Sequence, residues 1–462
     1  MPAPIAAASA GARLIAVLKA RGGVRPIGIT DTLQKLIGRL LTEDVKEAVA
    51  QQLHSDNPRV KQFAIGVPAG CPKLATYIQR YLDKHPGCVV ASSDCHNAFQ
   101  EMTHECAATG LAATEEGGGR GMLAHFCSMY DRPEGTTHSY FTADGQKHDV
   151  TLWTGFTQGA GPSTLIYSVG QHPKLVKVAE SASDVQIPSF VDDTWLLGPP
   201  DQSLIAAKEM QRVIPNELGG SIRKWEFLYA PEANALTAEE LQDAGITNAT
   251  VADGGLQIVG IPVGSPAYIQ ETIRSKVIEH ATPLNQLTSL ALSDAQAALL
   301  IFMYCSVRRA HHLLQVIPYD AAPEEFKKLD NNLVSTFAKI VDIDLDELTA
   351  HPDSLRRLRQ PWKNGGQGLP ALADVADPAL IAGWATIAPW LAKEFDRTLA
   401  TIDPATGTHD AHLTAAWDRL QAKGDDVRGL LPTNIDDLID SELKHLQRDI
   451  TQAKDNIDFK HM

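Results

Sequence analysis

The sequence has few cysteines, and none of the patterns in which cysteine usually builds structure. Its six cysteines include no CxxC pair and no dense framework, which excludes a disulfide-stapled secreted module and predicts reduced thiols in an intracellular protein. His96 and His104 could bind zinc together with Cys95 and Cys106, but structural zinc sites usually have short paired spacings. We therefore expect no zinc site.

Long apolar runs are also lacking. The longest, such as Ala297–Tyr304, fall short of the roughly 18 to 20 residues that cross a bilayer, so no membrane segment is expected. The first 23 residues lack acids and carry Arg13, Lys19 and Arg21, as an organelle transit peptide would, but residues 12–24 are better explained as part of the fold. The EEGGGRG run at 115–121 lacks the Lys-Ser/Thr ending of a phosphate-binding loop, which favours a flexible turn.

The chain has no excess of positive charge. Its 41 Lys and Arg face 56 Asp and Glu, for a formal net charge of -15, which argues against a broad nucleic-acid-binding surface. Acidic residues are concentrated at 342–347 and after Asp425, where they could lie away from a groove that binds nucleic acid. The basic residues, in contrast, form three clusters, at Lys19, Arg21, Arg25, Lys35 and Arg39, at Arg308, Arg309, His311 and His312, and at Arg356, Arg357, Arg359 and Lys363.

The order of the patterns predicts an α+β protein of more than one domain. Thr30 and Asp31 form a plausible cap for an amphipathic helix at 30–53, and a second helix is expected at 73–84. Asp144-Gly145 predicts a β-hairpin, and from residue 266 onward the pattern is helical, with amphipathic stretches at 268–281, 291–315 and 376–399. The apolar positions of the first helix are Leu33, Leu36, Ile37, Leu40 and Leu41.

Three acids stand where short apolar strands are expected to end. Asp94 follows the strand Cys88–Ser93, and Asp192 and Asp193 separate strands at 185–191 and 194–197, which predicts a tight hairpin with both acids at its tip. Phosphoryl transfer onto a growing strand uses two divalent cations about 3.5 to 4 Å apart, and Mg²⁺ takes one or two protein carboxylates plus substrate phosphates. If the two segments meet, the acids form a site for two Mg²⁺ ions, or Mn²⁺ in their place.

Several blocks occur in an order typical of one family. The sequence resembles a reverse transcriptase of the non-LTR retrotransposon class, in a divergent protist or algal form, over roughly Ala12 to Trp390. The order of the second to fourth blocks is the specific part of the match. The blocks are GGVRPIGITDTLQKLIGRLL, SSDCHNAF, TGFTQGAGPSTLIYSVGQHPKL, FVDD, SIRKWEFL followed by LQIVGIPVGS, and, further downstream, RQPWKNGGQGLPAL.

The resemblance implies a right-hand polymerase: fingers, a palm with an antiparallel sheet, a helical thumb and a helical C-terminal region. It implies an RNA-directed DNA polymerase that uses an RNA template, a DNA primer and deoxynucleoside triphosphates, in the nucleus or cytoplasm and without a membrane. The segments expected are fingers at 1–87, palm at 88–110, a fingers or palm insertion at 111–150, palm at 151–265, thumb at 266–375 and a helical extension at 376–462.

The resemblance also implies residue roles. Asp94, Asp192 and Asp193 would bind metal, and Lys224 would protonate the leaving pyrophosphate. Substrate would contact Arg25, Lys35, Phe99, Gln158 and Gly159, with Phe99 as a gate against ribose 2′-hydroxyls. Nucleic-acid phosphates would contact Arg308, Arg309, Arg356, Arg357, Arg359 and Lys363. Each has a structural alternative: a core position for Phe99, a loop for Gln158 and Gly159, and a solvated surface for the basic residues.

Two other hypotheses remain open. Ala160 and Gly161 stand where an Asp-Pro or similar pair usually follows Gln-Gly, and no upstream fingers segment, endonuclease or zinc knuckle is visible. These departures and the negative charge favour a catalytically silent, reverse-transcriptase-like fragment or captured element that binds RNA or protein in an assembly. The third, a nuclease or nucleotidyltransferase of another fold, does not explain Phe99 or Gln158.

Overall fold

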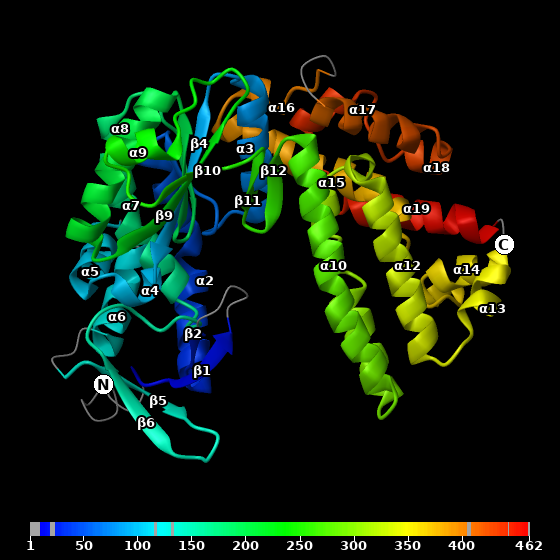
Figure 1. Ribbon diagram of the computed structural model, residues 1–462, viewed down its shortest axis with the longest axis horizontal. Coiled ribbons are helices and arrows are strands. Elements are labelled where there is room, and N and C mark those ends of the chain that lie inside the picture. Colours follow the sequence, from blue (N-terminus) through cyan, green and yellow to red (C-terminus); the bar gives the residue numbers. More distant parts are fainter. Residues whose placement is uncertain are drawn as a thin grey trace. The chain divides into compact units, whose positions relative to one another are not determined.

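The computed structural model describes residues 10–18, 24–114, 118–130, 134–403, 408–441 and 443–460. Most of the possible transit peptide, including Lys19 and Arg21, and the first three residues of the 115–121 turn lie outside these ranges. The chain forms two compact units (Figure 1): unit 1 comprises Met1–Cys71 and His85–Ala252, and unit 2 comprises Pro72–Lys84 and Asp253–Met462. The α+β class is confirmed. The six finer segments expected from the sequence stay a prediction.

A six-stranded sheet forms the centre of unit 1, in the order β10-β9-β4-β8-β7-β3. Strand β4 runs antiparallel to both β8 and β9, and β7 runs antiparallel to β8. Helix α8 packs on β4 and β8, and α7 packs on α5 and α8. The bounds are β3 Val60–Gln62, β4 Val89–His96, β7 Ile187–Phe190, β8 Asp193–Gly198, β9 Ser221–Tyr229, β10 Ala249–Val251, α5 His104–Ala113, α7 Ser163–Ser181 and α8 Pro200–Val213.

A second sheet in unit 1 has the order β2-β1-β5-β6. The predicted hairpin at Asp144-Gly145 is confirmed: Thr142 donates its backbone N–H to Gln146 at 3.1 Å, and Gly145 has φ of 85°, a left-handed conformation that glycine adopts without strain. This sheet carries Arg25 on β2. The strands are β1 Arg13–Leu18, β2 Val24–Ile29, β5 Thr136–Phe141 and β6 Lys147–Leu152.

Helix α2 (Thr32–Ser55) forms where it was predicted, and the Asp31 side chain accepts from Gln34 N at 3.1 Å as its cap. Near the start of the helix the buried residues are Gln34 and Gly38, where a Cβ on Gly38 would come within 2.8 Å of Pro162. Further along, the buried face is apolar and consists of Val45, Val49, Ala50 and Leu53. The predicted apolar positions Leu33, Leu36, Ile37 and Leu40 are exposed, and only Leu41 packs against the core.

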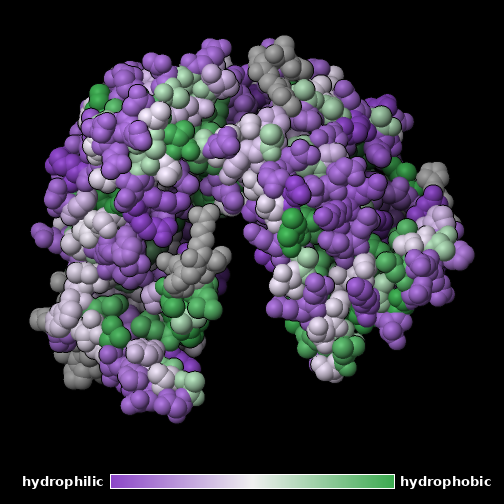
Figure 2. All heavy atoms as spheres, in the orientation of Figure 1, coloured by the Kyte–Doolittle hydropathy of each residue, from purple (hydrophilic) through white to green (hydrophobic). Residues whose placement is uncertain are grey.

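Exposed apolar residues also occur on β1 and β2, where Leu18 is 81% exposed. Figure 2 shows apolar side chains at the surface in this part of unit 1, and at the C-terminal end of α10 (Pro266–Ala291) in unit 2, where Leu292 is 92% exposed.

Unit 2 is helical apart from the β11–β12 hairpin. The amphipathic stretch predicted at 291–315 is not one helix: α11 ends at Ile301, a π-helical turn covers Phe302–Ser306, and turns follow. The bounds are α3 Gly70–Lys84, β11 Gly255–Ile258, β12 Ile261–Gly264, α11 Ala295–Ile301, α12 Pro323–Ile340, α13 Leu345–Ala350, α14 Pro352–Arg359, α15 Leu372–Glu394, α16 Arg397–Ala400, α17 Thr408–Gln421, α18 Asp425–Arg428 and α19 Leu446–Lys460.

Helix α15 is the core helix of unit 2. By length and composition alone it could cross a membrane, but 61% of its most apolar window is buried inside the protein. Trp384 is 1% exposed, and α12, α16, α17 and α19 pack around the helix. Among the described residues no other helix reaches that length and hydropathy.

A buried arginine joins α3 to the far end of the chain. Arg80 is fully buried. Its Nε donates to the carbonyl of Leu399 at 2.8 Å, and its other nitrogens contact the Asp410 carboxylate and the Thr401 carbonyl. The guanidinium also lies 5.3 Å from the centroid of Trp384. This network fixes α3 within unit 2.

Asp330 on α12 gives the first testable prediction. Both carboxylate oxygens accept from Leu372 N at 3.0 Å, and burial raises the pKa of Asp330 to about 6. The native state therefore binds more protons than the unfolded chain between about pH 4 and 6, so stability falls as pH rises through this window.

The variant Asp330→Asn keeps one hydrogen-bond acceptor but cannot ionise. We expect wild type to lose about 2–3 kcal/mol of unfolding free energy, relative to the variant, between pH 4 and 7. Urea unfolding of both proteins at pH 4 and pH 7 measures the change. The same difference in unfolding free energy between wild type and Asp330→Asn at the two pH values would contradict the prediction.

Candidate active site

Strand β4 brings Asp94 to the turn between β7 and β8. Ser93 pairs with Thr194 across β4 and β8, and Ser93 Oγ donates to the carbonyl of Thr194 at 3.0 Å. Asp193 is the first residue of β8 and pairs with Phe190. The hairpin therefore sits beside the strand that carries Asp94, as expected from the sequence. The predicted bounds are shifted, because β4 continues to His96 and Asp193 already belongs to β8, so that Val191 and Asp192 form the turn.

The hairpin tip is held in a strained conformation. Val191 has φ of 58°, a left-handed conformation that β-branched residues rarely adopt. Its backbone N–H donates to Gln62 Oε1 at 3.0 Å, and Gln62 is buried on β3. Backbone strain of this kind persists where the surroundings fix it, and it clusters at functional sites. Gln62 thus helps to set the position of Asp192 and Asp193.

The three carboxyl groups repel one another. Burial raises the pKa of Asp193 to about 7, with further contributions from the charges of Asp192 and Asp94. Burial also raises the pKa of Asp192, and Asp94 adds to the effect. Arg25 on β2 opposes both shifts. Because the charge of Asp94 raises the pKa of both Asp192 and Asp193, a cation placed among the three carboxyl groups would lower these two values.

Asp94 has a basic partner that the sequence reasoning missed. Its carboxylate forms an ion pair with Arg223 of β9. A bulge occurs at this point: Asp94 pairs with Lys224 and Cys95 with Ile222, so Arg223 is the extra residue on β9. A bulge adds an unpaired residue to one strand and can re-aim a side chain, and here the added residue, Arg223, contacts Asp94. The alternation of the SIRKWEFL segment gives no sign of it.

Lys224, the predicted general acid, stands opposite Asp94 in the register. Its ammonium pairs with Glu226 at 2.7 Å. Both Arg223 and Lys224 are thus cations on the strand next to Asp94, and Arg223 is the one in contact with the carboxylate. The proton-donor role of Lys224 stays a prediction.

The donor chemistry of the site suits a hard divalent cation, since Mg²⁺ prefers carboxylate oxygens. Among the residues that the structure describes, no three His, Cys, Asp or Glu side chains are grouped closely enough to hold a metal ion by themselves. One or two carboxylates with substrate phosphates are the usual Mg²⁺ environment, so a complete protein cage is not required. Asp94 would have to exchange Arg223 for the cation.

Gln158 and Gly159 lie against strand β2. Gly28 N donates to the carbonyl of Gln158 at 2.8 Å. Gly159 has φ of +103°, and a Cβ there would lie 3.1 Å from Ile27 Cγ2. Gly159 therefore permits a close approach between this loop and the strand that carries Arg25. Its predicted contact with substrate is untested.

Phe99 lies on α4 (Ala98–Glu101) and is half-buried. Its ring packs against Tyr167 at 5.2 Å and Phe156 at 6.2 Å between centroids. Tyr167 is buried, and the charges of Asp192 and Asp193 contribute to raising its pKa. Phe99 is thus one aromatic ring away from the acidic turn, which is compatible with both the gate and the core interpretation.

The other predicted basic residues lie on the protein surface. Lys35 is exposed on α2, as are Arg356 and Arg357 on α14, where Arg356 pairs with Asp353 at 3.4 Å. Arg359 is half-buried on α14, and Lys363 is exposed in a 3₁₀ turn at Trp362–Asn364. Arg308 and Arg309 are exposed after α11. Their nucleic-acid contacts stay predictions.

Comparison with known proteins found no match among protein-family models and none among curated proteins. Structures with some similarity include telomerase from Candida albicans in complex with a TWJ fragment of telomeric RNA, at 13% sequence identity and a TM-score of 0.47, covering 86% of this chain. The chain spans 64% of the length of that protein. Apo telomerase from Candida tropicalis shows 10% identity and a TM-score of 0.43, covering 91% of this chain and 68% of that one. The expected non-LTR retrotransposon family is not confirmed.

Proposed function

We propose that the chain is a template-directed nucleotidyltransferase of the reverse-transcriptase type, which extends a DNA primer on an RNA template. The observation that carries the proposal is the meeting of Asp94 on β4 with Asp192 and Asp193 at the β7–β8 turn, although 98 positions separate them in the sequence. The raised pKa values of Asp192 and Asp193 beside a third carboxylate are characteristic of functional sites.

The chain's own residues have distinct tasks in this proposal. Asp94 and Asp192 would hold Mg²⁺, which would supply activation of the primer hydroxyl and stabilisation of charge on the triphosphate. Asp193 lies next to them and raises their affinity for cations through its charge. Arg25 faces the same carboxylates and is placed to contact triphosphate oxygens, which a guanidinium binds with two parallel hydrogen bonds.

Arg223 keeps Asp94 paired until substrate and cation arrive. It then becomes available for the negative charge that develops on the leaving pyrophosphate, a role that the resemblance assigns to Lys224. Phe99, whose ring packs against Tyr167 and Phe156, is positioned to limit the space beside the sugar of the incoming nucleotide.

The test is Mg²⁺-dependent extension of a DNA primer annealed to an RNA template. Wild-type protein should extend the primer, and Asp192→Asn should not. Asp201→Asn, which changes an exposed acid on α8, controls for loss of charge and should behave as wild type. Absent extension in all three proteins, or equal extension by wild type and Asp192→Asn, would overturn the proposal. The first of these results would favour the catalytically silent alternative.

A further inference from the structure

Unit 2 contains a small cavity that is lined by both apolar and charged residues. It has a volume of about 100 Å³ and lies between α10, the segment after α11 and α12. Apolar side chains form its floor, among them Ile273, Leu313 and Phe326. On the same measure a water needs roughly 10–15 Å³, so the cavity has room for a small polyatomic ion.

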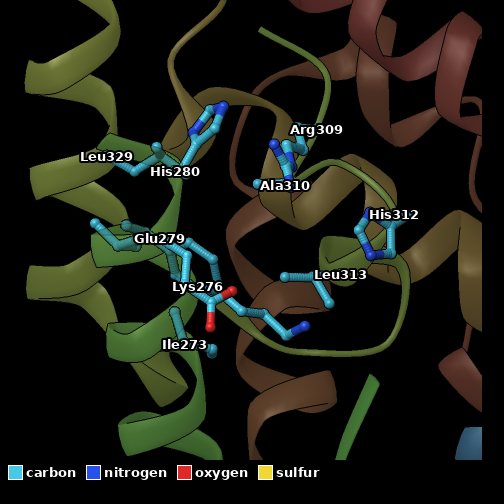
Figure 3. Close-up of a pocket in the computed structure, with 11 residues that line it drawn as sticks. Ile273, Lys276, Glu279, His280, Arg309, Ala310, His312, Leu313 and Leu329 are labelled. Atoms are coloured by element: carbon cyan, nitrogen blue, oxygen red, sulfur yellow. The ribbon is translucent and has the colours of Figure 1, made fainter. Parts of the chain in front are cut away.

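Four basic side chains are among those that line this cavity (Figure 3). Lys276 and His280 come from α10, and Arg309 and His312 come from the segment after α11. Burial lowers the pKa of His280, and the charge of Arg309 lowers it further. Burial is also the main cause of the lowered pKa of His312, to which the charges of Lys276 and Arg309 contribute. Arg309 therefore acts electrostatically on both histidines. Glu279 is the acid at the rim, and it is exposed.

His280 supplies an independent observation. It is only 5% exposed, and its Nε2 is buried without a hydrogen-bond partner. Buried polar atoms are nearly always paired, so an unpaired one indicates a missing partner such as a water or an ion. An imidazole Nε2–H can donate to an oxyanion. His280 lines the same cavity as the cationic residues Lys276 and Arg309.

We propose that this cavity binds a phosphate dianion, with Lys276 and Arg309 balancing its charge and His280 Nε2 donating a hydrogen bond. Arg309 can offer two parallel N–H groups and Lys276 a single ammonium, which suits a tetrahedral group with several oxygens. His312 stands at the exposed side. The proposal is independent of the carboxylates of unit 1 and of the proposed polymerase activity.

Two kinds of ligand present such a phosphate dianion: inorganic phosphate, and the terminal phosphate monoester of a nucleic-acid strand. The apolar floor and the small volume allow only the phosphate group itself to enter. A phosphodiester within a strand carries one charge and is flanked by sugars on both sides. It is therefore a poorer match to the paired cations than a terminal group.

The experiment follows the imidazole resonances of His280 by NMR while inorganic phosphate is added to the full chain at constant ionic strength. We expect a saturable change in wild type, and an affinity at least about tenfold weaker in Arg309→Ala and in Lys276→Ala, since each removes a charged hydrogen bond. Arg274→Ala, on the exposed face of α10, should bind as wild type. Thermal melting of each variant shows that it is folded.

A second arm compares a 5′-phosphorylated oligonucleotide with the same strand lacking its phosphate. Tighter binding of the phosphorylated strand, abolished in Arg309→Ala, assigns the site to a strand terminus. Equal binding of both strands, with phosphate still saturating, assigns it to free phosphate. No saturable change at His280 with either ligand, or unchanged affinity in both cavity variants, would overturn the proposal. Primer extension plays no part in these readouts, so they stand whether or not the chain polymerises DNA.

Discussion

Asp94→Asn is expected to lower the rate of RNA-templated primer extension by at least about 10³-fold. The substitution keeps the size of the side chain but removes one of the charges that would hold the catalytic cation. A cation that stabilises transition-state charge contributes several kcal/mol, and about 4 kcal/mol corresponds to a thousandfold. Single-turnover extension at saturating Mg²⁺ measures the loss.

Arg223→Gln separates this role from a structural one. Asp94→Asn also breaks the ion pair with Arg223, so a purely structural effect of that pair would appear equally in both variants. If Asp94 binds the cation, Arg223→Gln lowers the maximal rate much less than Asp94→Asn does, and it reaches half-maximal rate at a lower Mg²⁺ concentration because the carboxylate no longer has a competing partner. Equal loss of rate in both variants would count against cation binding by Asp94.

Arg80→Ala is expected to destabilise unit 2 by about 3–5 kcal/mol, because removing one partner of a buried ion pair leaves the other charge without compensation. Asp410 is 1% exposed, and a second cation, Lys84, lies 4.0 Å from its carboxylate. The carbonyls of Leu399 and Thr401 would also lose a donor. Hydrogen exchange of amides in α15 and α17 under mild urea measures the change within unit 2.

Two further variants make this result specific. Arg397→Ala removes an exposed arginine that pairs with Asp440 at 2.7 Å, and little change is expected because exposed pairs contribute little. The double variant Arg80→Met with Asp410→Leu replaces both charges by apolar groups and should recover part of the stability lost in Arg80→Ala. A double variant less stable than Arg80→Ala would indicate that loss of the polar network, rather than the charge that remains on Asp410, causes most of the destabilisation.

The acidic turn could be predicted because its signals are local. Apolar residues on both sides of Asp192 and Asp193 indicate two strands, and two polar residues between them leave room only for a tight turn. Asp94 follows a short apolar run that reads as a buried strand, and Val89, Val90 and Ala91 are indeed buried. The sequence alone could not establish that the two segments are neighbours; the order of family-like blocks supplied that expectation.

Helix α2 shows where periodicity is insufficient. The spacing of Leu33, Leu36 and Leu40 correctly predicts a helix, but periodicity does not say which face packs on the protein. Gly38 is the buried residue because only a residue without a side chain fits against Pro162. That contact depends on tertiary packing, which the pattern of the helix itself does not contain.

Arg223 was missed for a different reason. In a regular strand alternate residues face opposite sides, so Lys224 and Arg223 would not both reach Asp94. The bulge between Asp94 and Cys95 shifts the register by one residue. The composition of Ser221–Tyr229 gives no indication of this bulge. Register irregularities of one residue are therefore the features most easily lost when a site is inferred from sequence.

The place of α3 in the chain has a consequence for synthesis. Arg80 is made early, but its partners Leu399 and Asp410 follow 319 and 330 residues later. Since ribosomes add about 5–20 residues per second, the ring of Tyr77, which is 1% exposed and stacks on Phe395 in the finished protein, waits tens of seconds for this neighbour. Nascent chains stalled before residue 397 should consequently recruit chaperones to α3, and expression of such truncated lengths should yield aggregates.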